Sequence, residues 1–280
     1  EVTAAIVTAI EPQLSHVERQ RARRKPTENL DAWESHQRGL WHVFSYTRID
    51  DAIEDFERSV ALDSGFSSPH AGLAYSMAVR VLQWKSLDRA ADIARGLSEA
   101  EIALELDQND PFAHFSQGRI AMANADHDHA VDAFRQALRL NPNYALAHFG
   151  LAHALWHAGR PDEAVPHHDD AIRLSPQDPI LWAIQASKAI ALVMLEQYDP
   201  AIALSREAQR TGANQVWSYL GEASGLALSG RAMEAANVVQ HVKSFEPAFS
   251  VEFLGKSLPM NDFAAKERFI QGLALAGLEP

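Results

Sequence analysis

Apolar residues recur at three- and four-residue intervals along most of the chain, and short polar turns interrupt this pattern. Residues 111–124 and 145–158 show the spacing of a helix that buries one face. Each is followed by a polar turn and then by a second amphipathic stretch, at residues 130–140 and 164–174. The pattern therefore predicts helices that are joined in pairs.

The predicted helix pair repeats along the chain. Pro142 and Pro176 lie 34 residues apart and close two similar phrases, AFRQALRLNP and HHDDAIRLSP. Proline ends a helix because it forces the preceding residue out of the α region. One pair cannot bury its own apolar face, so several pairs must stack. We expect six units, at about residues 32–66, 67–110, 111–144, 145–178, 180–214 and 215–249, in an array that spans residues 27–250.

The third unit carries the clearest motif. Its second helix has the sequence Ala–x3–aromatic–x2–Ala, formed by Ala130, Phe134 and Ala137, after a small residue in the first helix. This motif resembles the tetratricopeptide repeat, most closely in residues 111–178 and more loosely elsewhere between residues 30 and 250. The resemblance implies an all-α, right-handed superhelical solenoid. It also implies that the first helix of each unit lines a concave groove.

The two ends of the chain differ from the repeats. Residues 1–26 carry five basic and three acidic residues, a net charge of +2, whereas the remainder carries −14. Four apolar residues of this segment follow helical spacing: Val7, Ile10, Leu14 and Val17. We expect an N-terminal linker helix, bent or shortened at Pro12, that packs on the first repeat or belongs to a partner surface or a preceding domain. We expect residues 251–280 to form C-terminal capping helices over the last repeat.

Three stretches are similar to the C-terminal part of certain bacterial signalling proteins: AIEPQLSHVERQRARRKPTENLDAWESHQRGL, ALDSGFSSPHAGLAYS and FLGKSLPMNDFAAKERFIQGLALAGLEP. In those proteins a class III adenylate/guanylate cyclase domain or a winged-helix DNA-binding domain precedes a small α/β domain and tetratricopeptide repeats. The resemblance implies a regulatory region whose output domain, a nucleotide cyclase by preference, lies upstream. The chain begins with Glu1 rather than Met, so we expect it to be a piece of a longer protein.

Composition excludes several classes of function. The net charge of −12 disfavours nucleic acid as a partner, because phosphate binding needs a surplus of Lys and Arg. The chain has no cysteine, which excludes disulfides, thiolate zinc sites and cysteine nucleophiles. No apolar run reaches the roughly 20 residues of a membrane helix. We expect a cytoplasmic protein without a cofactor, without membrane insertion and without a nucleic-acid partner.

The histidines are the candidates for a metal site. His153 and His157 are four residues apart, so they share one face of a helix, as metal-binding histidines can. The Glu of the His-Glu-x-x-His order is absent, and an ordinary surface or groove role is favoured, so the two are only weak metal candidates. His70, His114 and His148 recur at a repeat position that usually holds a large aromatic residue, which indicates packing.

The evidence for catalysis is weak. The adjacent carboxylates, such as Asp162–Glu163 and Asp169–Asp170, lie at helix starts or on polar faces, where solvated acids are expected. No Ser-His-Asp order and no glycine-rich phosphate loop stands out. We expect that this chain is not an enzyme, although its parent protein could be a nucleotide cyclase.

The groove implied by the resemblance is the better candidate site. Groove-facing residues are expected at the second, fifth, ninth, twelfth and thirteenth positions of a unit. The resulting partner-binding candidates are mostly large and apolar: Phe112, Phe115, Arg119, Met122, Phe149, His153, Trp156, His157, Ile190 and Trp217. A large apolar patch usually has a partner, so we expect a peptide or a helix, or the protein's own output domain, to bind there. Tighter packing of a curled solenoid would explain the same residues equally well.

Two other functions remain open at this stage. A pocket near His153, Trp156 and His157 would make the chain a sensor of a small ligand or a metal. A helix over residues 1–24 could instead build a homodimer, as in the dimerisation module of a transcriptional regulator. The scarcity of groove cations, with Arg119 alone, disfavours the Lys- and Asn-based clamp that some tetratricopeptide proteins use for a C-terminal carboxylate.

Overall fold

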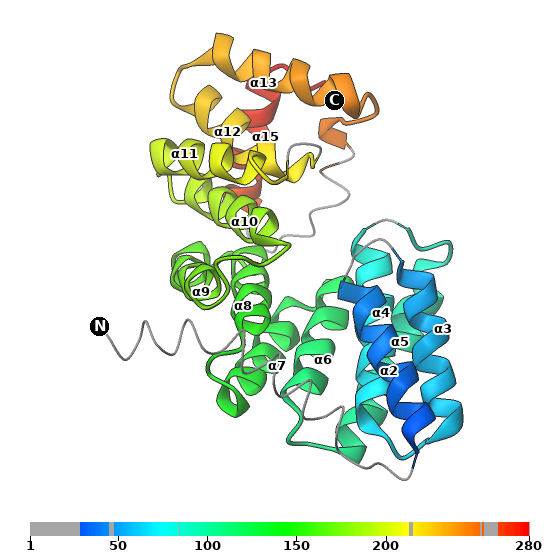
Figure 1. Cartoon of the computed structure of the whole chain (residues 1–280). Helices are drawn as coiled ribbons and strands as arrows, with labels where there is room; N and C mark the ends of the chain where they lie inside the picture. Colours follow the sequence, from blue (N-terminus) through cyan, green and yellow to red (C-terminus); the bar gives the residue numbers. More distant parts are fainter. Residues whose placement is uncertain are drawn as a thin grey trace. The chain divides into compact units, whose positions relative to one another are not determined.

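The computed structural model describes residues 29–44, 48–83, 85–212, 215–252, 254 and 263–279. The described residues form helices and no strand (Figure 1). The helices are α2 Leu30–Phe44, α3 Ile49–Leu62, α4 Ser67–Leu82, α5 Arg89–Leu106, α6 Pro111–Ala123, α7 His127–Leu140, α8 Ala145–His157, α9 Pro161–Leu174, α10 Leu181–Met194, α11 Tyr198–Gln209, α12 Trp217–Leu228, α13 Ala232–Phe245 and α15 Phe263–Leu275. The predicted all-α repeat fold is therefore confirmed. No helix among the described residues is long and apolar enough to cross a membrane.

The chain divides into two compact units, residues 1–150 and residues 151–280. The division falls inside α8, after Gly150. The described part of the first unit holds α2 to α7 and the start of α8, and the second holds the rest of α8, α9 to α13 and α15 (Figure 1). Within each unit a helix contacts its hairpin partner and the neighbouring pair, as in α2 with α3, α3 with α4, and α4 with α6. This is the stacking that a repeat needs to bury its apolar face.

A left-handed residue makes the turn inside several hairpins. Gly159 and Gly230 adopt φ angles of +80° and +83° at this point. Ala125 and Glu196 hold the same conformation, with φ of 59° and 60°, although their Cβ atoms make it less favourable. The helix after the turn can therefore reverse direction within a few residues.

Phenylalanine closes two seams of the first unit, where a seam is the contact between one helix pair and the next. Phe134 lies on α7, at the aromatic position of the Ala–x3–aromatic–x2–Ala motif, and is fully buried. Its ring fits between Gly118 of its own pair and Gly150 of the next, where an added Cβ would come within 2.7 Å and 2.5 Å of it. Phe56 on α3 lies in the same way between Gly39 and Gly72. We call this motif position the central position.

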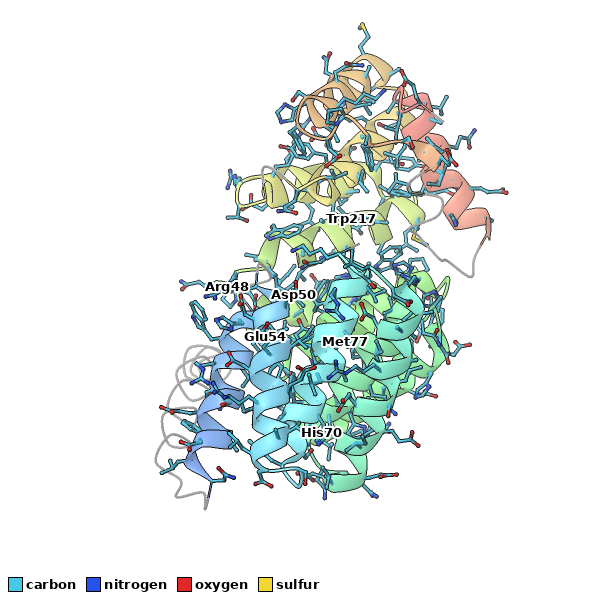
Figure 2. All side chains as sticks on the ribbon, turned by 90° about the vertical axis from the view of Figure 1, so that its right-hand side faces the viewer. Arg48, Asp50, Glu54, His70, Met77 and Trp217 are labelled. Atoms are coloured by element: carbon cyan, nitrogen blue, oxygen red, sulfur yellow. The ribbon has the colours of Figure 1, made fainter. Side chains whose placement is uncertain are left out.

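The seam between the second and third pairs is built differently. The central position on α5 is held by Ala100, and the space is closed from the other side. Gly96, one turn earlier, faces Ile120 and Met77, which lies midway along α4 (Figure 2). A Cβ on Gly96 would lie 2.5 Å from Ile120 Cδ1, so the close approach of the two pairs depends on this glycine.

In the second unit, α9 and α11 have polar residues at the central position. His168 on α9 is completely buried. Its Nδ1 lies 3.1 Å from the carbonyl oxygen of Ala164 and its Nε2 lies 2.9 Å from Ser187 Oγ. Because a carbonyl only accepts, Nδ1 carries the proton and Nε2 accepts the Ser187 hydroxyl. Ser187 Oγ in turn accepts the indole N–H of Trp156 at 2.8 Å. Burial lowers the pKa of His168 to about 3, so the ring is neutral.

The next seam of the second unit is also polar. Ser205, at the central position of α11, donates to the carbonyl oxygen of Ser218 at 2.6 Å and accepts the backbone N–H of Glu222 at 3.0 Å. The buried Glu222 carboxylate accepts hydrogen bonds from Arg206 at 2.6 Å and from Gln209 at 2.7 Å. The Ser205 hydroxyl and the Glu222 carboxylate thus both have hydrogen-bond partners, as buried polar groups require.

The C-terminal end of the array is covered. Helix α15 packs against α12, Phe269 is fully buried, and Ser224 Oγ donates to the Phe269 carbonyl oxygen at 3.1 Å. Gly277 follows the helix with φ +89°, the left-handed conformation expected of a residue that ends a helix. The predicted linker helix of residues 1–26 lies outside the described residues.

Candidate functional site

Aromatic side chains form a continuous row in the first unit. We call this row the aromatic ladder; its members are Phe44, Tyr75, Phe112, Phe115 and Tyr144. Three of the first helices, α2, α4 and α6, and the turn before α8 contribute the rings. Centroids of neighbouring rings lie 5.2–6.4 Å apart, which is the range for favourable aromatic pairs. The ladder therefore links four consecutive repeats along one face.

Two residues of the ladder are buried and three are partly exposed. Tyr75 and Phe115 are only 1% and 2% exposed. Phe44, Phe112 and Tyr144 are half-buried. Each of these three packs against a buried ring: Phe44 lies 5.6 Å from Tyr75 and Tyr144 lies 5.4 Å from Phe115, both tilted, and Phe112 stacks on Phe115 at 6.2 Å. Their positions are thus fixed by packing, while part of each residue stays accessible.

The charges around the ladder are few. Asp110 caps α6 by accepting the N–H of Phe112 at 2.8 Å, and burial raises the pKa of its carboxyl group. Burial also raises the pKa of Tyr144 well above its usual value, with smaller effects of Tyr75 and Asp110, so this phenol is neutral at physiological pH. Arg119, further along α6, is half-buried, and its Nε has no hydrogen-bond partner among the described residues.

The residues predicted for the groove fall into two classes. Five are buried: Phe115, Met122, Trp156, His157 and Ile190. Five are half-buried: Phe112, Arg119, Phe149, His153 and Trp217, the last at the start of α12 (Figure 2). Phe112, Phe115, Arg119, Met122 and Phe149 belong to the first unit, and the others belong to the second. Only the half-buried residues have surface to offer a partner, so the ten are not equivalent.

Three predicted residues of α8 form an aromatic group in the second unit. The ring of Trp156 lies 5.2 Å from that of His153 and 3.9 Å from that of His157. Trp156 is 1% exposed and its N–H is used by Ser187. A change at Trp156 would therefore test the packing of the second unit, and would be a poor probe of partner binding.

Two histidines of the repeats form a hydrogen bond with the turn that precedes their own helix. The Nε2 atom of His114 lies 3.0 Å from the carbonyl oxygen of Gln108, and that of His148 lies 2.9 Å from the carbonyl oxygen of Pro142. These bonds recur at the 34-residue interval. His70 instead bonds to Glu99 on α5, 2.6 Å away. All three thus connect their helix to a neighbouring segment.

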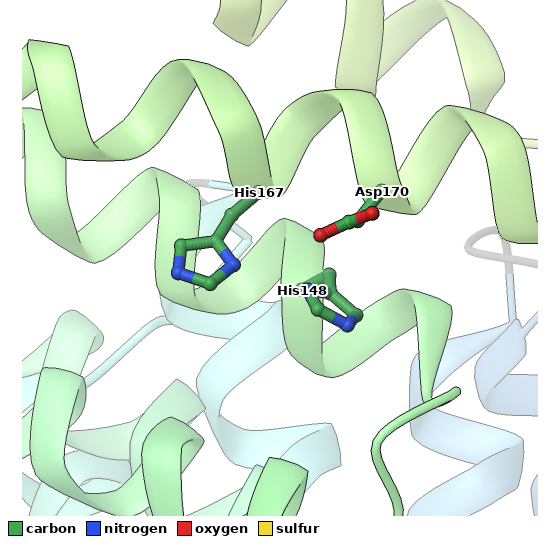
Figure 3. A group of neighbouring side chains, drawn as sticks. All are labelled: His148, His167 and Asp170. Atoms are coloured by element: carbon green, nitrogen blue, oxygen red, sulfur yellow. The ribbon is translucent and has the colours of Figure 1, made fainter.

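Metal binding gains little support at the predicted pair. The rings of His153 and His157 lie 4.9 Å apart. In the described part of the chain, however, the three side chains that lie close enough together to share a metal ion are His148, His167 and Asp170. His148 is on α8, and His167 and Asp170 are on α9 (Figure 3). His148 belongs to the first unit and the other two to the second, so no site is assigned to them. Asp170 pairs with Arg173 at 2.9 Å.

Comparison with known proteins supports the repeat. Residues 115–179 match a family model described as tetratricopeptide repeat. The sequence of this part of the chain is thus similar to tetratricopeptide repeats. The match covers the helix pairs around Phe134 and His168, which show the central position most clearly. No curated protein matches the sequence.

Solved structures show the same fold across most of the chain. The chain is similar to one in the Cut9–Hcn1 hetero-tetramer of APC/C, with 16% identity, a TM-score of 0.66, and coverage of 96% of this chain but 46% of that one. PilF of Pseudomonas aeruginosa matches with 17% identity and a TM-score of 0.58, over 85% of this chain and 98% of its own. The tetratricopeptide protein TTC0263 of Thermus thermophilus matches with 17% identity and a TM-score of 0.55, over 70% and 98%. At such identities these likenesses show the fold alone.

Three members of the aromatic ladder were missed by the sequence prediction. Phe44 and Tyr75 occupy the thirteenth and ninth positions of their units, which are groove-facing positions in the rule stated above. Applying that rule to the first two units would have found both. Tyr144 precedes its helix and lies outside the rule, so only the structure reveals its contact with Phe115.

Proposed function

We propose that the chain binds a protein partner through the aromatic ladder of the first unit and has no catalytic activity of its own. The observation that supports this most is the row of five rings across four repeats, three of them half-buried and held in place by the buried two. Fixed aromatic rings bind well because little side-chain freedom is lost on association.

The ladder favours a segment with apolar anchors. Phe44, Phe112 and Tyr144 are aromatic residues that keep part of their surface accessible, and the phenol of Tyr144 is neutral. Asp110 is occupied by its own helix end. Arg119 is the one predicted groove cation, and its Nε lacks a partner among the described residues. The matching partner is an amphipathic helix or an extended peptide with bulky apolar residues and one acid that meets Arg119.

The parent protein is, in this proposal, a cytoplasmic bacterial signalling protein with a nucleotide cyclase as its N-terminal output domain. The support is the similarity of the three quoted stretches to such proteins. The repeats would then regulate the output domain by contact with it or by capture of a partner. Sequencing the coding region upstream of Glu1 tests this, because a cyclase domain must carry the paired metal-binding aspartates. An upstream region without such a domain contradicts it.

Panning a peptide library on the chain tests the binding site. We expect the selected peptides to be apolar with aromatic or aliphatic anchors. The double variant Phe44→Ala/Phe112→Ala should lose binding by at least about 30-fold, because truncating central aromatic contacts costs about 2 kcal/mol or more. Fluorescence anisotropy of a labelled peptide gives the affinity, and circular dichroism checks that helicity is retained.

Met233→Ala is the matched control for this experiment. Met233 is 85% exposed on α13 in the second unit, far outside the ladder in sequence. It should leave the affinity unchanged. Equal affinity of the double variant and the control would overturn the proposed site. Cyclic nucleotide production by the isolated chain would overturn the absence of catalysis.

A further inference from the structure

The first helix of the array has an open apolar face. Helix α2 contacts α3 and α4 through a buried face that includes Ala32, Ser35 and Gly39. Its other side lines a hollow of about 840 Å³ with Leu30, Trp33, Glu34, Gln37, Arg38, Trp41 and His42. Leu30 is 59% exposed and Trp41 is 64% exposed, although these are large apolar side chains. We call this side the outer face of α2.

The other end of the array shows what such a face normally requires. In the second unit α15 covers α12, and burial of Phe269 is complete. Terminal repeats need a covering element, because their outward side would otherwise expose the surface that inner repeats bury in a seam. On the outer face of α2, in contrast, Trp41 stays largely exposed, and the described groups near its ring are polar: the His42 ring at 4.9 Å and the Arg48 guanidinium at 5.9 Å (Figure 2 labels Arg48).

We propose that the chain's own N-terminal segment, residues 7–17, docks as a helix on the outer face of α2 and caps the array. The segment lies directly upstream of α2 in the sequence. Its apolar stripe from Val7 to Val17 spans at most about 15 Å as a helix that bends at Pro12, and the face from Leu30 to Trp41 spans about 16 Å. The roughly 12 residues between Val17 and Leu30 are enough for an antiparallel return.

Charge supports the antiparallel direction. In that arrangement the end of the stripe lies beside the start of α2, so the basic run that follows passes the first turns of this helix. The run is Arg19, Arg21, Arg23, Arg24 and Lys25. Asp31 is in the first turn of α2, and Glu34 lines the hollow. Opposite charges are therefore close together, whereas a parallel direction would separate them.

The absence of cysteine from the sequence gives a clean test by cross-linking the full chain. In the variant Ile10→Cys/Gln37→Cys, one cysteine replaces a residue of the stripe and the other a residue that lines the hollow. The variant Ile10→Cys/Leu87→Cys is the control, because Leu87 is fully exposed in the turn between α4 and α5. Under mild oxidation the first pair should form an intrachain disulfide at least about 10-fold faster than the control.

Gel mobility and mass distinguish the outcomes. A fast intrachain product supports the proposal. An interchain product shows that the segment of a second copy occupies the face, and overturns self-capping. Equal rates for the two variants also overturn it. Hydrogen exchange gives an independent measurement without cysteines: Leu14→Asp/Val17→Asp should speed exchange of the α2 amides about 10-fold, and unchanged exchange contradicts docking. None of these outcomes depends on the aromatic ladder.

Discussion

The two units close their seams with different chemistry at the same position of the repeat. In the first unit Phe56 and Phe134 fill the central position, and glycines on both neighbouring helices make room for the ring. In the second unit His168 and Ser205 occupy it, and hydrogen bonds fix their orientation. A ring held by shape is sensitive to volume on either side. A polar residue held by bonds depends on its partners and, for histidine, on protonation. The same position of the repeat is thus sensitive to side-chain volume in the first unit and to hydrogen bonding and protonation in the second.

Removing a ring should have the largest effect. Phe134→Ala should lower the free energy of unfolding by about 3–5 kcal/mol, because the side chain is fully buried and leaves a cavity. Urea titration followed by circular dichroism measures this change. Leu62→Ala is the control; Leu62 is 41% exposed and should change stability by about 0.5 kcal/mol or less. A loss below about 1 kcal/mol for Phe134→Ala would break the comparison, since shape would then not hold this seam.

Adding a methyl group beside the same ring should have the next largest effect. Gly150→Ala places a Cβ 2.5 Å from Phe134 Cε1 and should destabilise the chain by about 1–3 kcal/mol. Gly65→Ala is the matched control, since the nearest atom there is 3.5 Å away. Phe134→Leu should partly rescue Gly150→Ala, because a smaller side chain relieves the clash. Strictly additive losses in the double variant would show that the two positions do not meet.

Acid should act on the second unit through His168. Its folded pKa is about 3, compared with 6.5 when unfolded, so the unfolded chain binds the extra proton. The stability is fully present above pH 6.5 and is lost as the pH falls from 6.5 toward 3, by about 2 kcal/mol at pH 5. The hydrogen-exchange protection factors of α9 and α10 amides should be lower at about pH 5 than at about pH 7. His168→Phe should remove most of this difference.

His36 must be controlled in that experiment. It lies on α2, its ring is 5.5 Å from that of Phe56, and burial lowers its pKa to about 4. It should therefore weaken the first unit over a similar pH range. We expect His36→Phe to flatten the pH dependence of α2 and α3 amides without changing that of α9 and α10. If His168→Phe left the pH dependence of α9 and α10 unchanged, the polar seam would not be the titrating element.

Much of the fold could be predicted from the pattern of apolar positions and prolines. The prolines that recur 34 residues apart and the Ala130–Phe134–Ala137 motif indicated helix pairs, and the structure places α6 to α9 there. These signals are local, since each depends on the conformation of a few adjacent residues. Capping helices were also predicted within residues 251–280, and α15 lies in this range.

The candidate site was harder to predict because burial depends on neighbouring repeats. Trp156 and Phe112 both occupy groove-facing positions, yet the first is buried against Ser187 and only the second keeps accessible surface. His168 was not predicted to be a packing residue, although its place in the motif is that of Phe134 in the preceding repeat. The sequence pattern predicts the helix face on which a residue lies. Its burial depends on the side chains that the next repeat places against that face.

The glycines around the phenylalanine rings have a consequence for the order of the modules. Phe56 and Phe134 each need a glycine that is encoded in the following repeat, Gly72 and Gly150. The third repeat has Ser116 at the place that Gly150 holds in the fourth. A tandem copy of the third repeat, inserted after the original, would therefore drive a serine side chain into the ring. The first repeat must therefore be followed by the second, and the third by the fourth, so these repeats cannot be exchanged for one another.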